Sequence, residues 1–177
     1  MTKKQIAANA VNALKKEYPE AICSLVYTDP LQLLIATRLA AQCTDARVNM
    51  VTPALFDRFK TVDDFANSSA DEVAEYIKSC GLYKTKSKDI VELAKMLRDD
   101  FGGEVPDNID DLIKLPGIGR KTANLVCGDI FGKPAVVFNI LFQVCVYGTQ
   151  GTNLHIGLHI RIFFHRHGIV LQYILIF

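Results

Sequence analysis

The stretch Leu115–Asn124 (LPGIGRKTAN) constrains the fold of this chain more than any other. It places Pro-Gly-Ile-Gly between the apolar end of one helix and the start of the next. Glycines let the backbone take positive φ and expose its N–H groups with no Cβ in the way. Those groups would lie at a helix N-terminus, where partial positive charge favours an anion such as a phosphate. The sequence therefore predicts two helices joined at Gly117 and Gly119, with an anion cradle at the turn.

Two cations follow this turn directly, Arg120 and Lys121, and we expect both in the first turn of the second helix. A phosphate held at the turn would then lie beside an amine that can act as a nucleophile. The alternative is an ordinary helix–turn–helix with two solvated cations, because short motifs give false positives. The motif favours the anion site over this alternative, and the rest of the chain strengthens that interpretation.

Helical spacing extends over most of the chain. Apolar residues recur at helical intervals in residues 5–17, 31–41, 45–59 and 86–101. No segment up to about residue 130 alternates for long enough to predict a strand. The sequence therefore predicts an all-α fold of short helices joined by tight turns.

Local signals indicate where these helices begin and end. Asp29-Pro30, Thr61 and Ser69 are typical helix starts, and Gly102-Gly103 is a typical helix end. The break at Gly81–Tyr83 predicts that the next helix resumes at Lys86. We expect the inner face of the helix over 45–59 to consist of Val48, Val51, Leu55 and Phe56. We also expect Val105-Pro106-Asp107 to cap the helix that follows Gly102-Gly103.

The composition is that of a soluble globular protein. Half of the 177 residues are apolar, 22% are charged, and the net charge is +1, so any DNA-binding surface must be local. Five cysteines occur singly, which favours a reducing cytosol over a disulfide framework. The first residues lack the apolar core of a signal peptide, and no apolar run approaches the length of a membrane span. We therefore expect a cytoplasmic protein.

Four segments in fixed order resemble endonuclease III, the bifunctional DNA glycosylase and apurinic-site lyase of the helix-hairpin-helix superfamily. They are residues 33–49 (LLIA…AQCTD…VN), Gly81-Leu82-Tyr83-x-x-Lys86, Gly103-Glu104-Val105-Pro106 and the LPGIGRKTAN hairpin. The resemblance covers roughly residues 5–137, and the ordered set is far more specific than any one piece. It implies the helix-hairpin-helix glycosylase fold, a helical barrel domain.

The resemblance also implies roles for individual residues. Lys121 matches the catalytic lysine, whose neutral amine attacks the sugar C1′ of an extruded nucleotide. A helix N-terminus, the adjacent Arg120 and partial burial would each disfavour its ammonium form. Gln42 and Leu82 match positions that enter the duplex in place of the extruded nucleotide. Taken singly, Lys121 is better explained as a solvated lysine, and the hairpin context is what favours the nucleophile. The alternatives for Gln42 and Leu82 are a helix-capping glutamine and a core leucine, and for Leu82 alone the two explanations are equally good.

The resemblance assigns the remaining contacts more loosely. Gly117, Gly119 and Arg120 would hold the DNA backbone, and Lys86, with its neighbours Lys84 and Lys88, would contact phosphates or lie in a solvated loop. Asp45 would be a polar contact at the mouth of the pocket or a helix cap. The lysine at position 121 favours the bifunctional branch over the related adenine glycosylases, which lack it.

The pattern breaks after residue 137. The family continues there with Val-Asp-Thr-His, whereas this chain has Phe138-Asn139-Ile140-Leu141. Asn139 falls at the catalytic aspartate position, and an amide can neither accept a proton nor carry a compensating charge. The family's four cysteines for a 4Fe–4S cluster have no counterpart here, because Cys145 is the one cysteine after 137. We therefore predict no metal or cofactor in this chain.

Other features of residues 138–177 also suggest an aberrant segment. All 19 acidic residues lie within positions 1–129, and Gly168–Phe177 is an apolar, β-branched and aromatic segment that predicts aggregation. Four histidines, His155, His159, His165 and His167, have no acid or cysteine pair beside them for a metal site. The sequence thus predicts a helical domain over 1–137 and a divergent, frameshifted or otherwise aberrant tail over 138–177, with the cluster domain missing or aberrant.

These observations lead to one functional prediction and two alternatives. The prediction is a monomeric base-excision repair glycosylase and AP lyase, associated with the bacterial nucleoid, that acts on oxidised pyrimidines and abasic sites in damaged duplex DNA. Its glycosylase activity is expected to be impaired by Asn139. The alternatives are a non-catalytic module that binds damaged DNA and a truncation product without function. The lesion preference is not determined by the sequence.

Overall fold

The computed structural model describes residues 22–133 without a break, residues 1–21 with gaps, Ala135, and the backbone of two strands between residues 160 and 173. The chain divides into two compact units. One is Ser24–Val126, and the other combines Met1–Cys23 with Cys127–Phe177. Within the predicted helix over 5–17, the residues that the structure describes are helical, whereas Asn139 lies outside the described residues. The predicted domain boundary between residues 137 and 138 stays a prediction.

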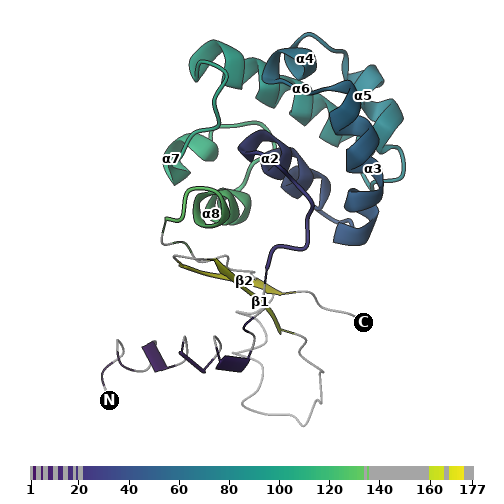
Figure 1. Ribbon diagram of the computed structural model, residues 1–177. Helices are drawn as coiled ribbons and strands as arrows, with labels where there is room; N and C mark the ends of the chain where they lie inside the picture. The colour runs from purple at the N-terminus through teal and green to yellow at the C-terminus, as the bar shows by residue number, and fades with distance from the viewer. Residues whose placement is uncertain are drawn as a thin grey trace, which may run out of the picture. The chain divides into compact units, whose positions relative to one another are not determined.

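The unit Ser24–Val126 is built from helices. They follow the order α2 (Pro30–Leu39), α3 (Asp45–Arg58), α4 (Val62–Ala66), α5 (Ala70–Ile77), α6 (Tyr83–Asp100), α7 (Ile109–Leu112) and α8 (Arg120–Asp129), whose last turn extends beyond this unit. Residues 22–133 contain no strand, which confirms the all-α prediction for this part of the chain. α4 and α5 pack against α6, and α2 packs against α3 and α6. Figure 1 shows α2 in the middle of these helices.

The central helix α2 is apolar on nearly every side, as its sequence predicts. Asp29 caps it: one carboxylate oxygen accepts the Gln32 N–H at 2.9 Å, and Pro30 occupies the first turn. Burying a large aliphatic side chain contributes roughly 1.5–3 kcal/mol. The side chains of α2 that have no exposed surface are Leu33, Leu34, Ile35, Ala36 and Leu39. α2 is therefore the element against which the other helices are placed.

The caps of the following helices confirm some predictions and correct others. Thr61 and Asp64 form a capping box at the start of α4, and Ser69 caps α5. The cap of α7 is Asn108 rather than Val105-Pro106-Asp107. The inner face of α3 also differs from the predicted one, because Thr52 is buried there while Val51 and Phe56 are only half-buried.

The long helix α6 begins at Tyr83, earlier than the predicted start at Lys86. Its N-cap, Leu82, has φ 57° and makes no side-chain capping bond, so the sequence carried no ordinary start signal. The helix ends as predicted: Gly102 and Gly103 take positive φ, and the Gly103 N–H donates to the Leu97 carbonyl at 2.8 Å.

Two antiparallel strands lie in the second unit. β1 (Ile160–His165) pairs with β2 (Gly168–Tyr173) in a register that runs from Ile160 opposite Tyr173 to His165 opposite Gly168. The all-α prediction therefore does not extend to this segment. Its β-branched and aromatic residues are types enriched in strands. None of the described helices is long and apolar enough to cross a bilayer.

Candidate active site

The predicted hairpin is present, formed by α7, the turn and α8, which begins at Arg120. Gly117 has φ +73°, whereas Gly119 is not among the residues with positive φ. The expectation that both glycines take positive φ is therefore wrong for Gly119. The Ile118 N–H donates to the Leu115 carbonyl at 3.1 Å, so it belongs to the turn and does not face an anion.

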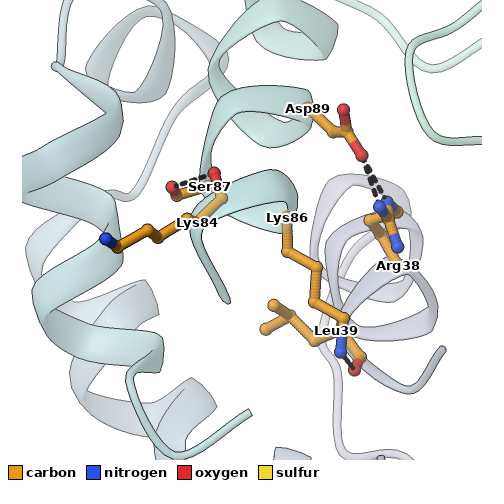
Figure 2. A network of polar contacts seen from close by, with 6 residues as sticks. All are labelled: Arg38, Leu39, Lys84, Lys86, Ser87 and Asp89. Atoms are coloured by element: carbon orange, nitrogen blue, oxygen red, sulfur yellow. Dashed lines mark hydrogen bonds and ion pairs between the residues drawn. The ribbon is translucent and has the colours of Figure 1, made fainter. Parts of the chain in front are cut away.

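Gly117 is required by a close approach as well as by its backbone angle. A Cβ at this position would clash with Arg38 Nε and lie 2.8 Å from an Asp89 carboxylate oxygen. These two residues form an ion pair between α2 and α6 (Figure 2), in which Arg38 Nε donates to Asp89 at 2.9 Å and Nη2 donates to the same oxygen. Their side chains are only 13% and 21% exposed. The turn thus rests on a nearly buried ion pair.

Gly119 is different, because no heavy atom lies within 4 Å of the position its Cβ would take. The residue is exposed, and so is Arg120 next to it. A glycine that faces open space leaves room for a ligand to approach the backbone closely. The outer side of the turn is therefore open at Gly119, and phosphate binding there stays a prediction.

Lys121 lies in the first turn of α8, and its residue is exposed at the surface. Neighbouring protein nevertheless removes part of the water around its ammonium, and this desolvation lowers the pKa of Lys121. The Asp45 carboxylate acts in the opposite direction and raises that pKa. The sequence predicted an additional effect of Arg120, but burial and Asp45 are the causes in the structure. The geometry thus favours a reactive amine with one carboxylate in electrostatic reach.

Asp45 is the first residue of α3, and its carboxylate accepts a hydrogen bond from the Ser24 hydroxyl. The cap of α3 is Thr44, whose hydroxyl accepts the Arg47 N–H at 3.3 Å. Asp45 is therefore not the helix cap that one interpretation expected. Its electrostatic effect on Lys121 links the start of α3 to the start of α8.

Gln42 and Leu82 share an unusual backbone conformation. Their φ angles are 54° and 57°, and they are the non-glycine residues with positive φ in the described part of the chain. Such a conformation costs roughly 1–3 kcal/mol and persists where the surrounding structure enforces it. A Cβ on Gly81 would lie 3.3 Å from the Gln42 carbonyl oxygen, so the two loops are in contact.

The exposure of these two residues removes their simpler explanations. Leu82 is 60% exposed and is therefore not a core leucine. Gln42 is also exposed and caps neither helix, because Ala40 ends α2 and Thr44 begins α3. An exposed leucine on a strained backbone points to a surface that acts on something outside the chain.

The prediction that Lys86 contacts phosphate is wrong. It has no exposed surface, and its Nζ donates to the Leu39 carbonyl at 2.7 Å. Figure 2 shows its side chain directed at the end of α2, whereas Lys84 extends away from α2. Lys84 and Lys88 are exposed and remain available to solvent or a ligand. Periodicity on α6 distinguishes these lysines, because positions 84 and 88 are one helical turn apart and Lys86 faces the other way.

The sequence pattern of the HhH-GPD superfamily of base excision DNA repair proteins matches residues 35–156. The chain belongs to this superfamily. The match continues past residue 137, where the residue-by-residue resemblance was thought to end. The fold confirms the predicted helix-hairpin-helix glycosylase architecture in residues 22–133.

Similar proteins give the same assignment. The chain is 50% identical to endonuclease III of Bacillus subtilis over 119 residues, which are 67% of this chain and 54% of the relative. It is 37% identical to endonuclease III of Escherichia coli over 133 residues, 75% of this chain and 63% of the relative. A trapped covalent endonuclease III–DNA intermediate, with an estranged adenine, matches at 45% identity and a TM-score of 0.72, over 78% of this chain and 65% of that one. The chain thus spans less than two thirds of the length of these relatives.

The residues of this HhH-GPD chain do not fit the iron–sulfur cluster that the resemblance implies. A 4Fe–4S cluster needs four cysteine thiolates, and Cys145 is the one cysteine after residue 137. In the described part of the chain, no three His, Cys, Asp or Glu side chains are grouped to hold a metal ion.

Sequence reasoning missed one structural part of the site, the Arg38–Asp89 pair. A lone arginine in the apolar run of α2 was the available signal, because an unpaired charge is almost never buried. Its partner lies 51 positions away on α6, and no local pattern indicates that separation.

Proposed function

We propose that this chain acts as an endonuclease III-type DNA glycosylase and AP lyase on oxidised pyrimidines and abasic sites in duplex DNA. The observation that carries the proposal is Lys121, an amine with a lowered pKa beside an accessible helix-hairpin-helix turn. Two strained, surface-exposed residues, Gln42 and Leu82, belong to the same compact unit. The endonuclease III–DNA complexes among the similar structures support DNA as the ligand.

The chemistry needs the unprotonated amine of Lys121. On a damaged nucleotide, this nitrogen attacks C1′ and the C1′–base bond breaks; the base leaves with the bonding electron pair and takes up the proton that the nitrogen loses. The C1′–O4′ bond then breaks, O4′ takes up a proton, and the opened sugar carries a Schiff base. On an abasic site, it adds to the C1′ aldehyde and water leaves, which gives a Schiff base. Loss of a C2′ proton then breaks the C3′–O bond, and the 3′ phosphate departs. Desolvation of Lys121 favours the neutral amine that both reactions require.

Gln42 and Leu82 would replace the extruded nucleotide in the duplex. Extrusion costs a few kcal/mol of stacking and pairing, so the gap must be filled. An amide can hydrogen-bond to the orphaned base, and an exposed leucine can act as an apolar wedge. Gly117, Gly119 and Arg120 would hold the strand by its phosphates.

Asn139 is proposed to weaken base excision more than the lyase reaction. Schiff-base formation with an abasic aldehyde needs the amine alone, whereas base expulsion develops positive charge on the sugar that a carboxylate stabilises. We therefore expect Asn139→Asp to raise excision of thymine glycol by about a hundredfold or more, the scale of general acid–base and charge stabilisation. Nicking of abasic DNA should change much less. Equal, low excision by both forms would show that position 139 does not supply the carboxylate.

Trapping on abasic DNA tests the proposed function itself. Incubation of the wild-type chain with an abasic duplex and borohydride is expected to leave a covalent protein–DNA adduct and, without borohydride, a nicked strand. Binding without adduct or nick would instead identify the non-catalytic module. Absence of a cooperative thermal transition would identify the truncation product without function, because a packed domain unfolds cooperatively.

Asp45 gives a pH-dependent prediction. Its negative charge raises the pKa of Lys121, so Asp45→Asn should lower that pKa further. More neutral amine is then present at a given pH, and the rise in trapping rate with pH should move to lower pH. Asn retains an acceptor for the Ser24 hydroxyl. Asp57→Asn, at the exposed far end of α3, is the matched control and should leave the profile in place. An unshifted profile in Asp45→Asn would contradict the electrostatic coupling.

The setting of this activity is proposed by analogy with bacterial endonuclease III. We expect the chain to act as a monomer on chromosomal DNA in the cytoplasm. Sedimentation of the purified chain, with and without an abasic duplex, tests the stoichiometry.

A further inference from the structure

Lys86 connects two loops that are far apart in sequence. Its backbone N–H donates to the Leu82 carbonyl at 3.0 Å, and its Nζ donates to the Leu39 carbonyl at 2.7 Å (Figure 2). Leu82 is the N-cap of α6, and Leu39 is the last residue of α2. One fully buried residue therefore joins the loop of Leu82 to the helix end that leads into Gln42.

The position of the Lys86 ammonium is electrostatically favourable. The last carbonyls of a helix have no partner within the helix and carry partial negative charge. The ammonium satisfies one of them, the carbonyl of Leu39. Burial lowers the pKa of Lys86, and the neighbouring thiols of Cys43 and Cys80 counteract that effect. Cys43 and Cys80 are the sequence neighbours of Gln42 and Gly81.

The two loops also touch directly. A Cβ added to Gly81 would lie only 3.3 Å from the Gln42 carbonyl oxygen. Both Gln42 and Leu82 have positive φ, which a non-glycine residue keeps only where its surroundings enforce it. The contacts of Lys86 act at the end of α2 and on Leu82 itself, so they are placed to supply that enforcement.

We propose that Lys86 is a positioning residue that fixes the spacing between Gln42 and Leu82, so that both side chains enter a duplex together. This inference rests on the proposed function. An apolar side chain of similar length would fill the space but leave the Leu39 carbonyl without its donor. The end of α2 would then shift relative to Leu82. Binding at the Gly117 turn depends on other residues and is expected to persist.

The first test measures how well the chain unstacks DNA. A duplex carries 2-aminopurine opposite a stable abasic analogue, and its fluorescence rises when the opposing base loses its stacking. Lys86→Met is expected to reduce this rise at least about fivefold, the effect of losing one buried hydrogen bond, and to change affinity for undamaged duplex less than about twofold. Ser87→Ala, which removes a partly buried hydrogen bond to the Lys84 carbonyl on the same turn, is the control and should keep the full rise. A full rise in Lys86→Met overturns the proposal.

The second test needs no DNA and separates the two proposals. In Lys86→Met, amide hydrogen exchange is expected to accelerate at least about tenfold in residues 40–45 and 80–86, while residues 95–100 of α6 keep their rate. Unchanged exchange in the two loops overturns the positioning role. If the wild-type chain fails to unstack DNA and this local acceleration is still found, the proposed function fails and the positioning role survives.

A second variant keeps the test decisive if Lys86→Met does not fold. Lys86→Gln retains an N–H donor on a shorter side chain that does not reach the Leu39 carbonyl as Lys86 does. Should Lys86→Met fail to unfold cooperatively, Lys86→Gln is expected to show the same loss of unstacking and the same local exchange. A cooperatively folded Lys86→Gln with wild-type unstacking overturns the proposal.

Discussion

Lys121→Ala is expected to abolish the borohydride-trapped adduct with abasic DNA, a loss of at least about a thousandfold, as when a nucleophile is removed from an enzyme. The reason is that the Schiff base is proposed to form on this nitrogen, and alanine offers no substitute at the first turn of α8. The adduct is measured by gel shift of labelled duplex after denaturation. Binding to the same duplex should weaken far less, because the turn and Arg120 remain.

Lys114→Ala is the matched control for this experiment. Lys114 precedes the turn, is exposed, and pairs with Asp111 at 2.6 Å. Its removal takes one positive charge from the same hairpin and should leave trapping near the wild-type level. Equal trapping by Lys121→Ala and the wild type would show that another amine is the nucleophile.

The second large effect is on stability. Gly117→Ala is expected to lower the free energy of unfolding by about 2–4 kcal/mol, because a Cβ meets a left-handed backbone and an ion pair that must move. Gly119→Ala should change it by less than about 1 kcal/mol, since its Cβ would project into open space without positive φ. Urea unfolding of both variants measures the difference.

The affinity for duplex DNA is expected to distinguish the two glycine variants in a different way from their stability. Gly119→Ala places a methyl group where a phosphate is proposed to approach, so its affinity for duplex should fall although its stability is kept. Equal stability of Gly117→Ala and Gly119→Ala would contradict the conclusion that the turn packs on the Arg38–Asp89 pair at Gly117.

The sequence predicts the helical fold well because its signals are local. Each helix start or end is indicated by a signal within four residues, as at Asp29-Pro30, the Thr61 capping box and the glycine pair after α6. Periodicity failed at α6, where a strained N-cap rather than a polar cap begins the helix. β1 and β2 lie in the tail over 138–177, where the sequence has no helical pattern, and these strands were not predicted.

The candidate site was predictable in part. The order of motifs pointed to Lys121, Gln42, Leu82 and the hairpin turn, and the structure brings them into one compact unit. Burial was not predictable: Lys86 looked like its exposed neighbours until the packing of α6 on α2 placed it inside. Long-range pairs such as Arg38–Asp89 depend on that packing and carry no local signal.

The strained backbones of Gln42 and Leu82 have a consequence for protein engineering. A library of random variants sorted only for heat resistance would enrich glycine or asparagine at these two positions, because such residues relax the left-handed conformation. The sorted population would gain melting temperature and lose the side chains proposed to probe DNA. Such an enrichment map would locate the two residues that are proposed to enter the duplex, without any substrate in the assay.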